Sequence, residues 1–190
     1  MTQEAPLDAW PTGLVPAGEG WFVVNVRDAA WVSHDALGAS CLFENPRGGP
    51  SLPELGIRVR VLQPGQPMSF YHAEEAQEGF LVLAGTCVLV VNGEERVLRP
   101  WDFFHSPAGT EHTIVGAGDG PAAILAVGAR HEPESFRYPV SEVAARHGAS
   151  VAAETTDPDE AYAGTGEWNL GRPHAADRLP WEQQGGVARG

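Results

Sequence analysis

The segment from residue 57 to residue 128 is a succession of short apolar runs separated by turn residues. Asn92-Gly93 lies between the apolar runs 88–91 and 96–98. Such a two-residue link is typical of a type I′ hairpin, in which both residues need a positive φ. Because no helical periodicity interrupts the runs, the pattern predicts an antiparallel sandwich or barrel. Strands are expected at 57–62, 68–74, 78–84, 86–91, 95–99, 103–106, 112–115 and 122–128.

The N-terminal region has a different texture. Residues 1–20 are rich in Pro, Gly and Ala and lack periodicity, which predicts an extended arm. Residues 21–26 and 39–43 are apolar enough to be strands of the same β domain. We therefore expect an arm at 1–20 and a β domain at 21–130.

Residues 131–190 form a third region, a C-terminal extension. Ser141 and Gly148 bracket a short segment that fits a helix with an N-cap and a glycine stop. Beyond residue 152, Pro, Gly and acidic residues surround the isolated aromatics Tyr162, Trp168 and Trp181. A disordered tail has little use for tryptophan, so these rings predict a tail anchored on its own domain or on a partner subunit.

Composition excludes several classes of function. The net charge is −13, which argues against nucleic acid and anionic membranes as partners. No apolar run reaches about 18 residues, so no transmembrane helix is expected. The first residues lack the charged and apolar parts of a secretory signal, which predicts a cytoplasmic protein. All 12 basic residues are arginines, which excludes Schiff-base chemistry and a Walker-A lysine.

Two histidine-bearing segments carry the candidate chemistry. His72, Glu74 and Glu78 have even numbers, so on extended strands their side chains can point to the same side. His112 follows the turn residues Pro107-Ala-Gly109, as a strand-opening residue would. Two imidazoles and two carboxylates from neighbouring strands predict a site for one divalent metal ion.

The two segments resemble the paired motifs of the cupin family, and the resemblance covers residues 65–116. The family's first motif is G-x5-H-x-H-x3,4-E-x6-G, and this chain has Gly65-x6-His72-x-Glu74-x3-Glu78-x6-Gly85. The second is G-x5-P-x-G-x2-H-x3-N, and this chain has Trp101-x5-Pro107-x-Gly109-x2-His112-x3-Gly116. The spacing is that of small single-domain microbial cupins.

The resemblance implies an all-β fold, the RmlC-like jelly-roll barrel or double-stranded β-helix, with a metal ion at its mouth. His72, Glu78 and His112 match ligand positions, whereas Glu74 stands where a second histidine is usual. Glu74 either completes the ligand set or acts as a base beside a three-ligand metal. The donor set suits Fe, Mn, Ni or Zn. The resemblance also implies a homodimer.

Three further polar residues are candidates for the pocket. His105 shares parity with Phe103 and either faces the pocket as an acid or base, or is a packed or surface residue. Arg58 and Arg60 share one strand face. They would bind a carboxylate if that face lines the barrel, but the sequence favours a solvated face.

Three functions are consistent with these features. The first is a metal-dependent enzyme acting on a small organic molecule, an oxidoreductase such as a dioxygenase, an isomerase or a decarboxylase. The second is a non-catalytic module that binds or senses a small ligand. The third is a scaffold without a working site. Polar groups beside the metal would favour the enzyme, and purely apolar walls would favour the binding module.

Overall fold

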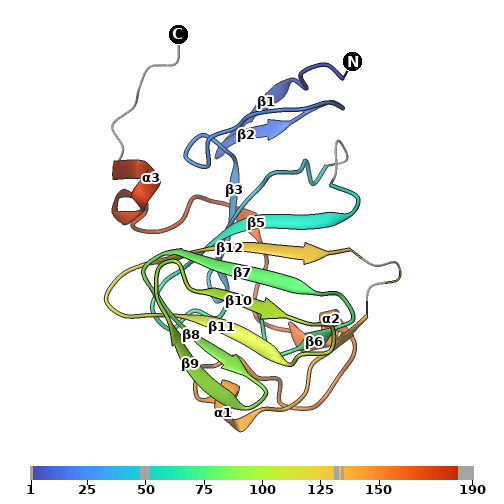
Figure 1. The fold of residues 1–190 in the computed structure, drawn as a ribbon, viewed down its shortest axis with the longest axis vertical. Coiled ribbons are helices and arrows are strands. Elements are labelled where there is room, and N and C mark those ends of the chain that lie inside the picture. The colour runs from blue at the N-terminus through green and yellow to red at the C-terminus, as the bar shows by residue number, and fades with distance from the viewer. Residues whose placement is uncertain (1, 48–51, 131–132, 134, 184–190) are drawn as a thin grey trace.

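Two antiparallel sheets packed face to face make up the centre of the computed structural model, which describes residues 2–47, 52–130, 133 and 135–183 (Figure 1). The larger sheet has the order β10 (Phe103–Ser106), β7 (Glu78–Ala84), β12 (Ala122–Ala129), β5 (Leu55–Leu62), β4 (Gly38–Cys41), β3 (Trp31–His34) and β14 (Asn169–Leu170). The smaller has the order β11 (His112–Ala117), β8 (Thr86–Val91) and β9 (Glu94–Leu98). A separate pair joins β6 (Ala73–Glu74) to β13 (Phe136–Arg137).

The main core lies between these two sheets. Phe80 and Val82 of β7 and Ile124 of β12 are buried against Leu89 of β8 and Ile114 of β11. Alternate residues of each strand supply this core, as expected for sheets that bury one face on each other. The predicted all-β jelly-roll class, with a short helix and a tail at the C-terminal end, is confirmed.

The central strands follow the sequence pattern closely. β7, β8 and β10 have the predicted bounds, and the other strands predicted between 95 and 128 differ by at most two residues at an end. Asn92 and Gly93 have φ values of 46° and 76°, so the predicted hairpin between β8 and β9 is confirmed. Of the predicted strand 68–74, only β6 is formed.

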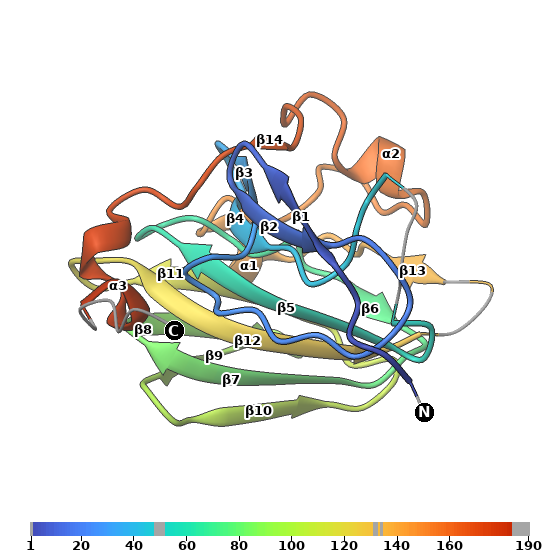
Figure 2. The same ribbon diagram turned by 90° about the horizontal axis from the view of Figure 1, so that it is seen from above.

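The N-terminal region differs from its prediction. The arm contains a hairpin of β1 (Leu7–Trp10) and β2 (Gly13–Pro16), which lies above β5 in Figure 1 and toward the viewer in Figure 2. Residues 22–26 form no strand, because Asn25 begins a turn. Its backbone carbonyl accepts hydrogen bonds from the amides of Asp28 and Ala29. Its side chain accepts one from the amide of Arg27.

The C-terminal extension contains the predicted helix, α1 (Glu142–Ala145). Ser141 caps it by accepting a hydrogen bond from the amide of Ala144, and Gly148 follows with a φ of 65°. The tail adds three further short elements: α2 (Pro158–Ala161), the 3₁₀ turn η1 (Ala176–Arg178) and α3 (Pro180–Gln183). No helix in the described ranges is long and apolar enough to cross a membrane.

Aromatic rings anchor this tail on its own domain, which is one of the two predicted alternatives. Tyr162 stacks on Phe70, with ring centroids 5.0 Å apart. Trp181 of α3 stacks on Trp31 of β3 at 6.0 Å. Trp168 packs against His34. The tail therefore contacts both faces of the larger sheet, because Trp31 and His34 differ in parity along β3 and point to opposite faces.

Candidate metal centre

A cavity of about 270 Å³ opens between the sheets where β6, β7 and β11 meet the inner face of β5 and β12. The four predicted metal-site residues all line it: His72, Glu74, Glu78 and His112. His72 directly precedes β6, Glu78 begins β7 and His112 begins β11. Each comes at the end of a strand, so the packing of the sheets gathers them at one rim.

Three of these residues form a tight cluster. One ligand atom each from His72, Glu78 and His112 lies within 4.8 Å of the others. The two histidines face each other across an antiparallel bridge, in which the amide of His112 donates to the carbonyl of His72 at 2.8 Å. Their ring centroids are 5.2 Å apart. The cluster has the donor types and spacing of a divalent-metal site.

Backbone carbonyls fix the tautomer of both rings. Nδ1 of His72 lies 2.8 Å from the carbonyl oxygen of Phe70, and Nδ1 of His112 lies 3.0 Å from that of Thr110. A carbonyl oxygen only accepts, so each Nδ1 carries the proton and donates it. The Nε2 atoms of the neutral rings are therefore left as lone-pair donors for a metal, the usual arrangement of metal-ligating histidines.

Electrostatics keep His72 neutral. Burial, followed by the nearby His112, lowers the pKa of His72 from 6.5 to about 4, although the Phe70 carbonyl and Glu78 act in the opposite direction. A histidine with this pKa is deprotonated at neutral pH, which is the form that binds a metal.

The Glu78 carboxylate provides the test of whether a cation fits. Its Oε2 lies 3.1 Å from Nε2 of His112. This oxygen is buried and has no hydrogen-bond partner in the described part of the chain. In the neutral ring of His112, whose proton is on Nδ1, Nε2 is an electron-pair donor that faces this oxygen at short range. A cation shared by both atoms would satisfy them, so these residues fit a metal ion.

Glu74 lies beside this cluster in the same cavity. An added Cβ at Gly128 of β12 would lie 3.8 Å from Oε1 of Glu78 and 3.9 Å from Oε1 of Glu74. Both carboxylates therefore reach over the same glycine. The three-residue cluster does not include Glu74. Whether Glu74 is a fourth ligand or a base stays a prediction.

The structure does not bring His105 into the cavity. On β10, Phe104 packs against Phe80 and His112, and Ser106 is buried beside His112. Since side chains alternate along a strand, Phe103 and His105 point to the opposite side, where both are exposed. The position of His105 therefore does not support the alternative in which it faces the pocket as an acid or base. It fits the alternative of a surface residue.

Two contacts of the histidines were not predicted from the sequence. Oγ of Ser106 lies 3.3 Å from Nδ1 of His112. The ring of Tyr138 stacks on His72 with centroids 5.7 Å apart. The even parity of Ser106 with Phe104 could have indicated the first contact. No local pattern indicated the second, because Tyr138 comes from the C-terminal extension.

Arg58 and Arg60 also line the cavity. The solvated-face interpretation favoured by the sequence is therefore wrong for Arg60, whose Nε is buried, whereas Arg58 is exposed. β5 lies in the middle of the larger sheet, between β12 and β4. Leu62, two residues further on, continues this face into the main core.

Comparison with known proteins agrees with this architecture. Residues 58–128 match the family model of the cupin domain, and this stretch contains the three residues of the candidate metal cluster. A search of curated proteins finds no match.

Solved structures share the fold. A sugar phosphate isomerase of the cupin superfamily from Silicibacter pomeroyi is 24% identical, with a TM-score of 0.53, over 60% of this chain and 79% of that one. A structure from Acidithiobacillus ferrooxidans assigned as a sugar phosphate isomerase is 25% identical, with a TM-score of 0.44. That match covers 45% of this chain and 56% of the other, so the chain spans little more than half of that relative. The likeness shows the fold.

Proposed function

We propose that this protein is a metal-dependent enzyme acting on a small organic molecule, with His72, Glu78 and His112 holding one divalent ion. The observation that carries the proposal is the short approach of the buried Glu78 Oε2, which has no hydrogen-bond partner in the described residues, to Nε2 of His112, 3.1 Å apart. Fe, Mn, Ni and Zn are the metals that two imidazoles and a carboxylate favour.

In this proposal the residues of the chain have separate roles. A bound ion would act as a Lewis acid on a substrate oxygen. The Nδ1 hydrogen bonds of His72 and His112 to backbone carbonyls hold both rings in orientation. Glu74, which lines the cavity outside the three-residue cluster, would accept a proton from the substrate as a base. This division suits an isomerase, a decarboxylase or an oxidoreductase.

A non-catalytic binding or sensing module is the alternative. A cavity walled only by apolar side chains would favour it. Here Glu74, Arg58 and Arg60 line the cavity with the three proposed ligands, which supports an enzyme.

Elemental analysis of purified protein tests the metal site. We expect nearly one divalent ion per chain in the wild type and a loss of about ten-fold or more in His112→Ala. His147→Ala is the matched control, because that partly exposed histidine contacts Glu95 away from the cavity. Wild-type protein that folds, yet contains no metal and takes none up, would contradict the proposal.

A second variant separates the two roles of Glu74. Glu74→Gln should keep the metal if Glu74 is a base, since the three ligands remain. It should lose much of the metal if Glu74 is a fourth ligand. Metal content per folded chain, with the fold checked by circular dichroism, decides between these roles.

A further inference from the structure

The inner face of β5 presents two arginines to the metal cavity. Arg58 and Arg60 both line the cavity that contains the metal cluster. Arg60 pairs with Ile124 of β12, and Arg58 pairs with Ala126 two residues further along the same strand. β12 lies between β5 and β7, so the two arginines and Glu78 lie on either side of β12 on one face of the sheet. The cavity thus has a cationic side as well as the metal cluster.

These two arginines lack a carboxylate partner, unlike the third arginine of the same cavity. Arg130 lines the same cavity, but Glu44 neutralises it through two hydrogen bonds of 3.1 and 2.6 Å. Within the described ranges, neither Arg58 nor Arg60 lies at ion-pair distance from any carboxylate. In a protein with a net charge of −13, two neighbouring unneutralised cations in one cavity need a reason.

Arg60 is held rigidly in place. Its Nη2 donates to the backbone carbonyls of Leu37 and Met68 at 2.9 and 2.8 Å. The ring of Trp168 lies over the guanidinium at 5.1 Å. Its Nε is buried and has no hydrogen-bond partner among the described residues. Burial, and secondly the charge of Arg58, lowers the pKa of Arg60 to about 10, so the group remains protonated at neutral pH.

Arg58 is more exposed and shows no hydrogen bond or ion pair within the described ranges. The charge of Arg60 is buried without a counterion, which is costly. A guanidinium binds carboxylate or phosphate oxygens in a matching planar geometry. With a divalent ion present, the positive charge of the ion and of both arginines exceeds the negative charge of Glu74 and Glu78. The cavity as a whole then attracts an anion.

We propose that Arg58 and Arg60 bind an anionic oxygen group of the substrate, a carboxylate or a phosphate, while the rest of the molecule reaches the metal cluster. This inference rests on the proposed function and names the class of substrate, a small organic anion. Arg58 makes the accessible contact, and Arg60 supplies fixed positive charge beneath it.

Titration calorimetry on the metal-loaded full chain tests the inference. The probes are malonate, inorganic phosphate and malonamide, the uncharged analogue of malonate. We expect malonate or phosphate to bind, and whichever binds identifies the anionic group. Malonamide should not bind. Arg58→Gln should weaken anion binding about ten-fold or more. Arg146→Gln, which removes an exposed arginine of the C-terminal extension, should leave it unchanged.

The inference would be overturned if neither anion bound the wild type, or if Arg58→Gln bound anions as tightly as the wild type. Metal content measured on the same samples separates the two proposals. The titrations are repeated on chelator-treated protein. Anion binding that depends on Arg58 in a protein that takes up no metal would leave this inference standing and the proposed metal enzyme refuted.

Discussion

His72 shows at the scale of one residue how the fold prepares the site. Burial lowers the pKa of His72, so the ring is neutral at neutral pH. The Phe70 carbonyl holds the single proton of the neutral ring on Nδ1. The same burial that favours metal binding makes the metal-free protein sensitive to acid. The unfolded chain binds a proton at His72 near pH 6.5, whereas the folded chain does so only near pH 4.

The pH dependence of stability follows from this difference. Between pH 6.5 and about 4 the unfolded state binds more protons at His72, so the free energy of unfolding falls as the pH is lowered through this window. The contribution of this group is about 3 kcal/mol in total. Denaturant unfolding of metal-free protein across the window checks it. His72→Gln should show a shallower decline, and an identical decline in both proteins would contradict the expectation.

At the scale of elements, the departures from the cupin motifs have structural explanations. Trp101 stands where the second motif has glycine and still adopts a φ of 76°. Gly116 stands where asparagine is usual. It lies in β11 against the turn after β5, where the amide of Gly65 donates to the carbonyl of Gly116 at 2.8 Å. This chain therefore uses the position for close packing of two backbones.

Gly116→Asn should be strongly destabilising. An added Cβ would lie 2.3 Å from the carbonyl oxygen of Gln63, and a backbone atom cannot move aside cheaply. We expect a loss of about 3 kcal/mol, measured by thermal or denaturant unfolding. Gly65→Asn is the matched control in the same contact. Nothing lies within 4 Å of its added Cβ, so this variant carries only the backbone strain of a side chain at a φ of 86°, which asparagine bears better than most residues. Equal losses in the two variants would refute the packing explanation.

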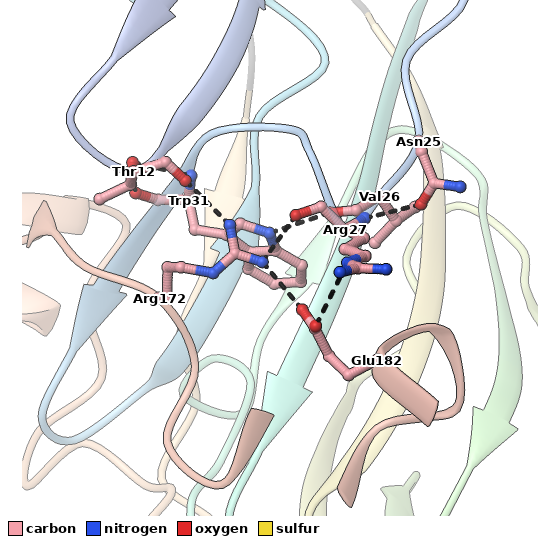
Figure 3. A network of polar contacts seen from close by, with 7 residues as sticks. All are labelled: Thr12, Asn25, Val26, Arg27, Trp31, Arg172 and Glu182. Atoms are coloured by element: carbon pink, nitrogen blue, oxygen red, sulfur yellow. Dashed lines mark hydrogen bonds and ion pairs between the residues drawn. The ribbon is translucent and has the colours of Figure 1, made fainter. Parts of the chain in front are cut away.

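At the scale of the whole molecule, the C-terminal tail connects the N-terminal hairpin to the larger sheet. Arg172 donates to the carbonyls of Thr12 and Arg27 and to Glu182 of α3, as Figure 3 shows. Glu182 also pairs with Arg27 at 3.6 Å. One arginine therefore links segments about 160 residues apart in sequence.

The homodimer stays a prediction, which light scattering of the full chain would test.

Arg172→Met should destabilise the whole chain by about 2 kcal/mol, because it leaves two carbonyls and a carboxylate without their donor. Arg146→Met, which removes a largely exposed ion pair with Glu95, should cost less than about 0.5 kcal/mol. Chemical unfolding of both variants makes the comparison. A similar small loss in both would mean that the tail contributes little to global stability.

Local pattern was sufficient for the central strands and for three residues that the structure gathers into a candidate metal cluster. Alternation and turn residues located β7, β8 and β10, and motif spacing indicated His72, Glu78 and His112. Pattern was insufficient at the N-terminus, where backbone contacts organise the chain. The hairpin of β1 and β2 docks through the amide of Leu14, which donates to the carbonyl of Asp28. Such contacts leave no periodic signal in side chains.

The sequence by itself determined which residues share a strand face, because side chains alternate with a period of two. Only the tertiary structure decided which face is inside. It turned Arg58 and Arg60 toward the metal cavity and His105 away from it. It also brought Tyr138 from the C-terminal extension against His72. The physical reason is that a strand has two equivalent faces until a second sheet buries one of them.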